Sequence, residues 1–209
     1  MKALKYIISV VAIVIIAYNS VYFKKLDEVK AVKAAATFDA SKYAQTFWNN
    51  KLLPNINRAI DLNQLTTMLS TDTTKTFETY SHALGIGNLR YFLVKGKGEI
   101  TLINDDDIVV SLLGDTTTYI RTIATEYVFG NAVRDATGLI DINEFSNTMD
   151  FNNVSAELNK IIREKVLPPF KSAVKKGNTI EFVGAIELNK EHLNLQKIEV
   201  VPIEIKIAQ

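Results

Sequence analysis

The chain has 209 residues, of which 47% are hydrophobic and 22% charged, and this supplies enough apolar surface for one ordinary domain or two small ones. Its 24 basic and 23 acidic side chains leave a formal net charge of +1 without a basic stripe, which argues against nucleic acid as a partner. Cysteine is absent, which excludes disulfides, thiol catalysis, thiolate metal sites and a lipid-modified cysteine.

The N-terminal segment predicts a membrane anchor. Residues 6–23 carry no charge, have lysines on both sides, and are close to the shortest helix that crosses roughly 30 Å of hydrocarbon. A cleaved signal peptide has a similar start, but the first Ala-x-Ala cleavage signal, at 34–36, lies too far downstream. A buried core helix is disfavoured because apolar residues cover every face. We therefore expect residues 1–37 to form an uncleaved anchor and linker, with the basic leader inside and the body outside.

Two later stretches resemble each other. FDASKYAQTFWNNKLLPNI begins at Phe38, and FNNVSAELNKIIREKVLPPF begins at Phe151. In both, Phe precedes Asp or Asn, which can cap a helix, and the stretch ends on Lys-aliphatic-Leu-Pro. Because proline lacks an N–H and clashes with the preceding turn, Pro54 and Pro168 should kink or end these helices.

A β-rich region broken by glycine follows each helix. A helical linker leads from the first helix into RYFLVKGKGEITLI, and NTIEFVGAIEL follows the second. Glycines inside strands, such as Gly96 and Gly184, indicate bulges or sharp bends, and Pro202 in the last strand indicates an edge or a bulge. Leu-Pro at a helix end is common and could match by chance, but the shared order of features favours a duplication.

The predicted fold class is therefore α+β and mainly β. We expect two tandem, duplicated, barrel-like (OB-like) units, each led by a helix, at residues 38–150 and 151–209. A transmembrane helix precedes them.

The stretch DATGLIDINEF, residues 135–145, has letters of a calcium-binding EF-hand loop. Aligning Gly138 with the glycine of that loop places Val133 at the first ligand position and only a hydroxyl, from Thr137, at the fifth. The entering segment TTYIRTIATEYVF is β-branched and aromatic, which predicts a strand where an EF-hand needs a helix. We expect no calcium site here.

Other chemical motifs are missing as well. The sequence has no P-loop, G-x-G-x-x-G or G-x-S-x-G motif, and neither His82 nor His192 neighbours a second histidine or a tight acidic cluster. We expect no catalytic residue, no metal site, no cofactor and no enzymatic activity.

The candidate binding residues are Arg134 and Asp135, which follow the strand end FGNAV. A planar guanidinium and a carboxylate suit the vicinal hydroxyls of a sugar. The favoured alternative is an internal salt bridge that pins the connection between the two units. A groove that joins this pair to Tyr119 and Trp48 would indicate a ligand site, whereas an exposed apolar patch on a barrel face would indicate a protein partner.

The same region resembles a known bacterial family of predicted periplasmic lipoproteins, domain of unknown function 2291. Five stretches carry the resemblance, in collinear order between Phe38 and the C-terminus: Trp48 to Pro54, FLVKGKGE (92–99), GNAVRD (130–135), GLIDINEFSN (138–147) and FNNVSAELN (151–159). The resemblance implies an export segment, a tandem pair of β-rich domains and, because such genes often neighbour sugar transporters of the ATP-binding-cassette (ABC) type, an accessory role in the envelope. It implies no catalytic residues. This chain departs from the lipoprotein description because it has no cysteine to lipidate, so a helix must serve as the anchor.

Together these observations predict a membrane-anchored, extracytoplasmic binding or accessory protein, associated with a sugar ABC transport system through a transporter component or a small sugar. The alternative is a structural or assembly factor of the envelope that binds another protein, and the third hypothesis is an enzyme that acts on carbohydrate. The expected location is the cell envelope, with the anchor in the inner membrane and the body in the periplasm or outside.

Overall fold

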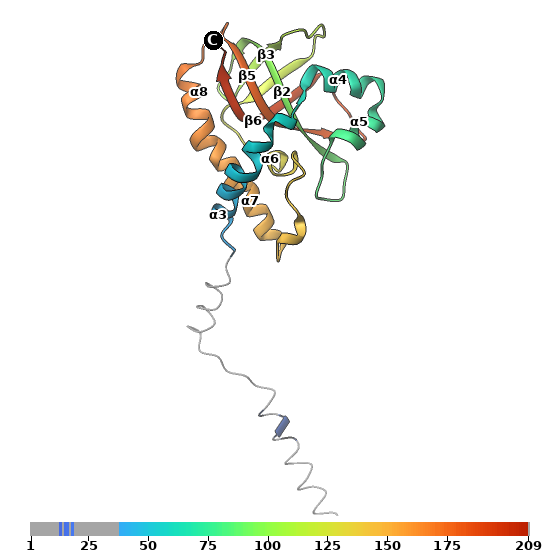
Figure 1. The fold of residues 1–209 in the computed structure, drawn as a ribbon, viewed down its shortest axis with the longest axis vertical. Helices are drawn as coiled ribbons and strands as arrows, with labels where there is room; N and C mark the ends of the chain where they lie inside the picture. Colours follow the sequence, from blue (N-terminus) through green and yellow to red (C-terminus); the bar gives the residue numbers. More distant parts are fainter. Residues whose placement is uncertain (1–12, 14, 17, 19–37, 209) are drawn as a thin grey trace, which may run out of the picture. The chain divides into compact units, whose positions relative to one another are not determined.

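The structure, a computed structural model, describes residues 13, 15, 16, 18 and 38–208. Most of the predicted anchor at residues 6–23 lies outside the described residues, and among those described no helix is both long and apolar enough to cross a membrane. A compact unit that begins at Asp39 contains the strands among the described residues and the helices from α3 onward (Figure 1).

Five strands close one barrel in the part of the chain that the structure describes. They are β2 (Leu89–Ile103), β3 (Asp107–Leu112), β4 (Ile120–Ala124), β5 (Thr179–Asn189) and β6 (Lys197–Ile207). They are hydrogen-bonded in the order β2-β3-β4-β6-β5, and β5 pairs back onto β2. β4 and β6 run parallel, whereas the other neighbours in the barrel are antiparallel. The two-residue strand β1 (Ile60–Asp61) pairs with β2 from outside this ring.

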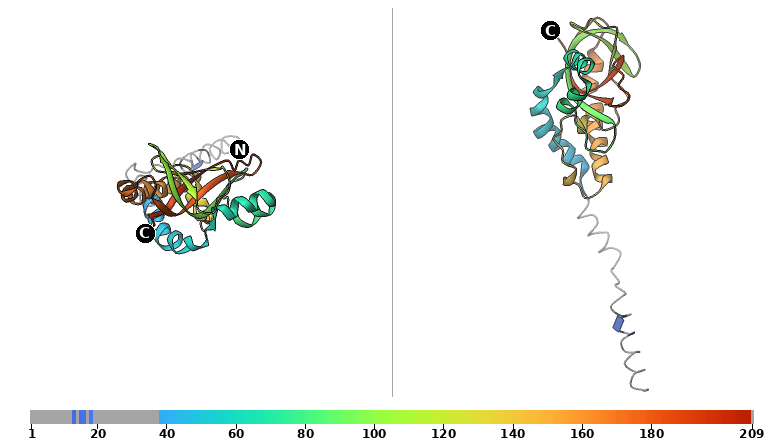
Figure 2. Two further views of the ribbon diagram at one scale, coloured as in Figure 1. Left: turned by 90° about the horizontal axis from the view of Figure 1, so that it is seen from above. Right: turned by 90° about the vertical axis from the view of Figure 1, so that its right-hand side faces the viewer.

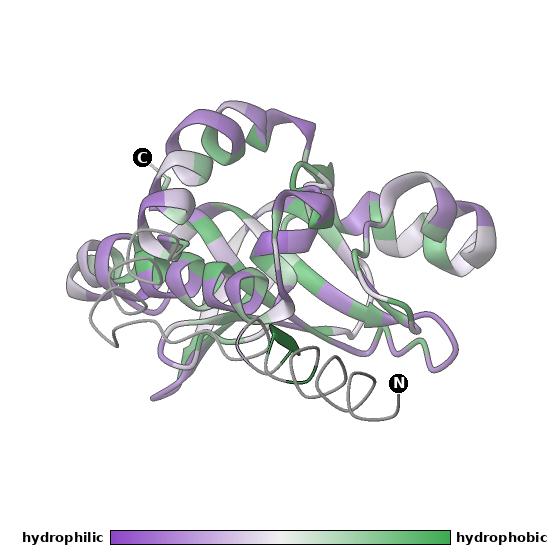
Figure 3. Cartoon of the chain, turned by 90° about the horizontal axis from the view of Figure 1, so that it is seen from below, coloured by the Kyte–Doolittle hydropathy of each residue, from purple (hydrophilic) through white to green (hydrophobic). Residues whose placement is uncertain are grey.

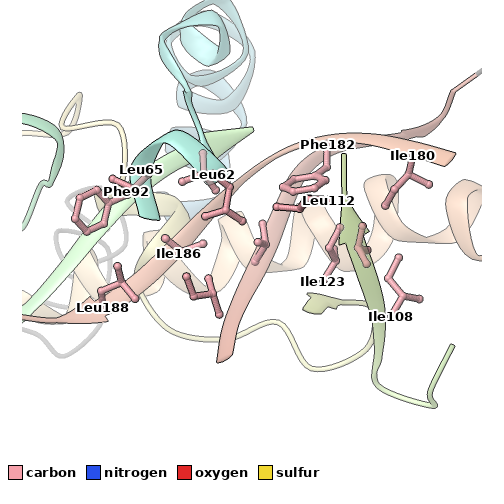
Figure 4. Packing of buried hydrophobic residues seen from close by; sticks show 14 of the residues in the cluster. Leu62, Leu65, Phe92, Ile108, Leu112, Ile123, Ile180, Phe182, Ile186 and Leu188 are labelled. Carbon is pink, nitrogen blue, oxygen red and sulfur yellow. The ribbon is translucent and has the colours of Figure 1, made fainter. Parts of the chain in front are cut away.

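The barrel interior is the hydrophobic core. Alternate residues of the strands point inward, as Ile180, Phe182 and Ile186 do on β5. Leu62 and Leu65 of α4 (Leu62–Thr71) join the same cluster (Figure 4). Phe170 of α8 (Leu167–Ala173) also belongs to it. Each fully buried side chain of this size stabilises the fold by about 1.5–3 kcal/mol. Hydrophobic residues lie along the strands and inner helix faces, and polar residues on the outer faces (Figure 3).

Glycine and proline allow the barrel to bend where the sequence predicts it. A Cβ at Gly184 would collide with Val200 and with the Val201 carbonyl of β6. The register between β5 and β6 shifts next to Gly184, which lies opposite Pro202. The bulge predicted at Pro202 is therefore confirmed.

The two similar helical stretches have the same local build. α3 (Ala40–Phe47) continues through the π-helical turn η1 (Trp48–Leu52) into the 3-10 helix η2 (Leu53–Arg58). α7 (Thr148–Ile161) continues through the π-helical turn η4 (Ile162–Val166) into α8. α3 and α7 pack against each other. The helix type changes at both Leu-Pro steps because proline, which lacks an N–H, is tolerated in the first turn of a new helix.

One of the two predicted caps is correct. The Asp39 carboxylate accepts the Lys42 N–H and caps α3, as predicted. α7 begins earlier than the sequence pattern suggests, and its cap is Asn147, which accepts the N–H of Asp150.

Three shorter elements complete the helical layer. α5 (Thr73–Tyr80) follows α4 at one side of the barrel, whereas α3 and α7 lie beneath it in the view of Figure 1. α6 (Ala132–Asp135) and the 3-10 turn η3 (Ile142–Glu144) connect β4 to α7.

The prediction of two tandem barrels is wrong. β2 and β5, from the two predicted units, pair continuously from Leu89 opposite Asn189 to Glu99 opposite Thr179, so both segments build one barrel (Figure 2). The expected boundary at residues 150 and 151 falls inside α7. The physical reason is that residues 151–209 contain only two strands, and a two-stranded hairpin is at best marginally stable alone.

Candidate ligand-binding site

Arg134 and Asp135 form a buried ion pair in α6. Their exposed fractions are 3% and 2%. Nε of Arg134 donates to Oδ1 of Asp135 (2.6 Å), and Nη2 donates to Oδ2 (3.1 Å). The third guanidinium nitrogen, Nη1, donates to the Phe151 carbonyl (3.4 Å), and the guanidinium lies 3.5 Å from the centre of the Phe151 ring. The pair is therefore an internal salt bridge whose charges satisfy each other.

α7 and the π-helical turn η4 that continues it hold the segment that follows β4 through polar side chains at every fourth position. Asn159 Nδ2 donates to the Gly130 carbonyl (2.9 Å), and Arg163 Nη1 donates to the Val128 carbonyl (2.5 Å). Residues four apart lie on the same helix face, so one stripe of the helix fixes this segment. Gly130 has φ +78°, a conformation that favours glycine.

The same stripe continues toward the start of α7. Ser155 Oγ donates to Oδ1 of Asn131 (2.9 Å), and Phe151 contacts Arg134 as described above. Residues 128–134 and 151–163 are thus in direct contact, and Asn131, partly exposed, is held at the surface of this junction.

Two pockets adjoin Asn131, and we call them together the Asn131 site. The smaller, about 210 Å³, lies between the Arg134–Asp135 pair and the segment 83–89, with Tyr91 and Phe151 in its wall. The larger, about 500 Å³, lies against the outer side of β5 and β6. It is lined by Phe129, Gly130, Asn131, Ala132, Ala185, Glu187, Lys197, Ile198, Glu199 and Val201.

Exposed aromatic rings stand beside the larger pocket. Tyr127 and Phe129 are 64% and 68% exposed, while Val128 between them is buried. The two rings stack with centroids 6.3 Å apart and planes 19° apart. An aromatic pair left in water at a pocket rim is unusual in a core-forming segment and offers a flat apolar surface to a ligand.

The ionisable groups that line the Asn131 site include hydrogen-bond donors and acceptors, and side chains of both positive and negative charge. Burial raises the pKa of Tyr91 to about 12, and the charges of Glu187 and Asp135 add to this effect, so Tyr91 stays a neutral hydrogen-bonding phenol. Tyr91 and Glu187 are cross-strand partners. Burial, with Asp107 nearby, raises the pKa of Glu199, and Lys197 opposes the shift. Such a set can bind a polar, uncharged ligand through several hydrogen bonds.

Comparison with known sequences decides the family. The sequence model of domain of unknown function 2291, described as a predicted periplasmic lipoprotein family, matches residues 11–206. The chain belongs to this family. The family description supports a location in the cell envelope, and no curated protein matches the chain.

A crystal structure of an OB-fold protein from Thermotoga maritima is similar to this family member. The two sequences are 28% identical, the TM-score is 0.73, and the match covers 82% of this chain and 99% of the other. A five-stranded Greek-key barrel is the architecture of an OB-fold. The predicted OB-like character is confirmed for one barrel.

The remaining predicted site residues of this DUF2291 chain lie elsewhere. Tyr119 precedes β4, whereas Arg134 follows its other end, and the Tyr119 ring contacts the guanidinium of Arg121 (4.9 Å). Trp48 is 7% exposed in η1, within the packed helical layer. Neither lines the two pockets of the Asn131 site. In the part of the chain that the structure describes, neither of these two pockets joins Arg134 and Asp135 to Tyr119 or Trp48.

The stretch that resembles an EF-hand has a structural use in this DUF2291 chain. The segment before it contains β4, so the predicted strand is confirmed. Asp141 caps η3 by accepting the Asn143 N–H (2.9 Å). Glu144 accepts the Tyr43 hydroxyl (2.6 Å) and lies 3.7 Å from Nζ of Lys51. Among the described residues no group of three His, Cys, Asp or Glu side chains could hold a metal ion.

Sequence reasoning missed the residues that build the larger pocket. Glu187 and Glu199 are outward positions of strands whose inward positions are apolar, and this alternation does not distinguish a pocket wall from open surface. One signal was available: the polar residues Ser155, Asn159 and Arg163 repeat at every fourth position of a helix and so indicate a polar contact along one face.

Proposed function

We propose that this DUF2291 protein is a binding module of the cell envelope whose Asn131 site takes a sugar or a similar polyhydroxylated ligand. The observation that carries the proposal is the exposed stack of Tyr127 and Phe129 beside a pocket lined by Asn131, Glu187 and Glu199. The apolar C–H face of a sugar can pack on an aromatic ring, while its hydroxyls bond to carboxylate and amide groups. The pocket of about 500 Å³ is within the usual range for small-molecule sites.

The proposed context is an accessory role beside a sugar ABC transport system. Residues 6–23 would anchor the chain in the inner membrane and leave the barrel in the periplasm or outside. The family description, a predicted periplasmic lipoprotein, supports the envelope location. The proposed partner is a transporter component, and the proposal gives the chain no catalytic role.

The alternative, an envelope assembly factor that binds another protein, is supported by apolar side chains at the rim of the smaller pocket of the Asn131 site. Ile86 is fully exposed within the segment 83–89, and Leu89 is 44% exposed. Apolar side chains of this size left in water are typical of protein-binding surfaces when they lie together.

The test is equilibrium binding of a panel of mono- and disaccharides to the full-length chain in detergent, measured by saturation-transfer NMR and calorimetry. We expect one sugar class to bind, and Phe129→Ala and Glu187→Gln to weaken it about tenfold or more, the effect of about 1.4 kcal/mol. Leu113→Ala, which removes another exposed apolar side chain, is the matched control and should leave the affinity unchanged.

Three outcomes would count against this proposal. Binding of no sugar rejects the ligand class, binding that both variants retain rejects the Asn131 site, and conversion of a sugar into product shows an enzyme. Isolation of partners from solubilised membranes with the parent and an Ile86→Ser variant separates the alternative, since only a protein-binding surface at residues 83–89 would lose its partner.

A further inference from the structure

A second polar pocket lies on the β1 side of the barrel and shares no lining residue with the Asn131 site. Its volume is about 120 Å³, and its walls come from η2, β1, α5, β2 and the segment after α6. The lining residues are Asn55, Arg58, Ile60, Thr79, Tyr80, His82, Leu93, Ala136 and Thr137. Six of these side chains can donate a hydrogen bond, and none is acidic.

The backbone and a glycine fix the position of His82. Its N–H donates to the Tyr91 carbonyl (2.8 Å), and its carbonyl accepts the Tyr91 N–H (2.9 Å). Gly138 packs against the imidazole so closely that a Cβ there would lie 2.5 Å from Nδ1. Gly138 also has φ +64°, so an L side chain at this position would be strained in any case. The imidazole is therefore held in place in the pocket wall.

Arg58 is the charged residue of this pocket. It lies at the end of η2, is exposed, and within the part of the chain that the structure describes no carboxylate lies within ion-pair distance of its guanidinium. Its positive charge reaches His82: burial first, and then the charge of Arg58, lowers the pKa of His82. A guanidinium and an imidazole that can donate a hydrogen bond line one small space without an acidic neighbour, which favours an anion between them.

The polar groups around this space complete a set of donors. Thr137 is 5% exposed, and its hydroxyl oxygen accepts the Leu139 N–H (3.3 Å), which leaves the hydroxyl proton free to donate elsewhere. Thr79 and Tyr80 add hydroxyls, and Asn55 adds an amide. One water occupies about 30 Å³ of liquid, so the volume admits a tetrahedral ion of a few oxygens.

We infer that this pocket binds a small oxyanion of the size of phosphate between Arg58 and His82. The ion accepts hydrogen bonds from both side chains and from the neighbouring hydroxyls. This site is independent of the sugar proposal, because no residue contributes to both.

The chain provides its own control, since it contains only two histidines. His192 lies exposed in the turn between β5 and β6, where its backbone N–H is bound by Asn189 (3.0 Å). The experiment is a pH titration of the imidazole C–H signals by NMR, on the full-length chain in detergent with labelled histidine. Each titration is run in sodium chloride and in inorganic phosphate of equal ionic strength.

Phosphate should raise the pKa of His82 in a saturable way by about half a unit or more, since a nearby anion favours the protonated imidazole. The His192 signal should not move between the two salts. A His82 pKa that phosphate leaves unchanged, or that moves together with that of His192, would overturn the inference.

Variants locate the ion. Arg58→Gln should abolish the phosphate-dependent shift, and it should itself raise the pKa of His82 in chloride because it removes a neighbouring positive charge. Arg90→Gln is the matched control, since the Arg90 guanidinium is bound by backbone carbonyls of Gly87 and Leu89, and it should keep the parent response. A phosphate response that survives in Arg58→Gln contradicts the site. Acetate in place of phosphate then shows whether the pocket selects a tetrahedral ion over a carboxylate.

Discussion

Two arginines are almost fully buried in this protein, and their surroundings differ. Arg134 is 3% exposed and places its three nitrogens on Asp135 and the Phe151 carbonyl. Arg121 is 1% exposed, and its Nη1 donates to the Leu195 carbonyl (3.0 Å). Nε and Nη2 of Arg121 have no hydrogen-bond acceptor among the described residues, and the Asp115 carboxylate stays 3.8 Å from Nη2.

The difference shows that burial alone does not measure the contribution of a charge to stability. A buried donor without an acceptor costs about 1–3 kcal/mol, so the same side chain stabilises the fold in one place and weakens it in another. The pKa of Arg121 is consistent with this cost, because burial lowers it and the nearby Asp115 carboxylate opposes the shift. Stability in this fold should therefore depend more on the α6–α7 junction than on the Arg121 surroundings.

The largest expected effect is the loss of the Arg134–Asp135 pair. Arg134→Ala and Asp135→Ala should each reduce the free energy of unfolding by about 3–5 kcal/mol, because each leaves a buried charge without its partner. Urea denaturation measures this, and the double variant Arg134→Met, Asp135→Leu should recover part of the loss. If both single variants unfold like the parent and sugar binding is lost, the pair belongs to a binding site. The contrast in stability between Arg134 and Arg121 would then be wrong.

The next largest effect concerns the polar side chains of α7 and η4 that bind the segment after β4. Asn159 is 4% exposed and donates to the Gly130 carbonyl, so Asn159→Ala should cost about 0.5–1.5 kcal/mol by removing a partly buried hydrogen bond. Asn152→Ala, on the exposed side of the same helix, serves as the control and should change stability by less than about 0.5 kcal/mol. Equal effects of the two variants in thermal unfolding would show that the stripe does not hold the junction.

Arg121→Met tests the other side of the comparison. Methionine fills a similar volume without the desolvation cost, so the free energy of unfolding should change by less than about 1 kcal/mol or increase. The matched variant Arg134→Met should be strongly destabilised in the same urea experiment. Similar losses in both would mean that Arg121 is as well compensated as Arg134.

The smallest expected effect is on the pH dependence of stability, through the partly buried carboxylate of Glu199. Because the pKa of Glu199 is raised in the folded state, the fold binds its proton more tightly than the unfolded chain does. The stability from this proton is present at low pH and is lost as pH rises through the folded pKa. Glu199→Gln should therefore exceed the parent in stability at pH 7, by less than about 0.5 kcal/mol because water screens the group, and the two should converge near pH 4.

Local features of the fold were open to sequence reasoning, and the closure of the barrel was not. The bulge opposite Pro202, the strand before Gly138 and the changes of helix type at both Leu-Pro steps follow from backbone chemistry within a few residues. The pairing of β2 with β5 joins segments about ninety residues apart, and period-2 alternation specifies a face but not a partner. For this reason the two similar helical stretches predict two units, whereas the strands that follow them form one barrel.

The candidate site was predictable only in part, for a related reason. Arg134 and Asp135 are adjacent in sequence, so an internal pair could be proposed without the fold. Tyr91, Glu187 and Phe129 come from three separate elements, and only the barrel register and the α7 stripe bring them beside Asn131. The prediction for Tyr119 and Trp48 rests on residue type, which does not determine where a side chain lies in the fold.

The position of β6 in the barrel determines when the barrel can close during synthesis of the chain. β6 connects β4 to β5, so the ring cannot be completed until residues 197–207 have left the ribosome. Contacts this distant along the chain form slowly, because loop-closure entropy must be overcome first. The barrel of a nascent chain of this design therefore stays open through most of translation.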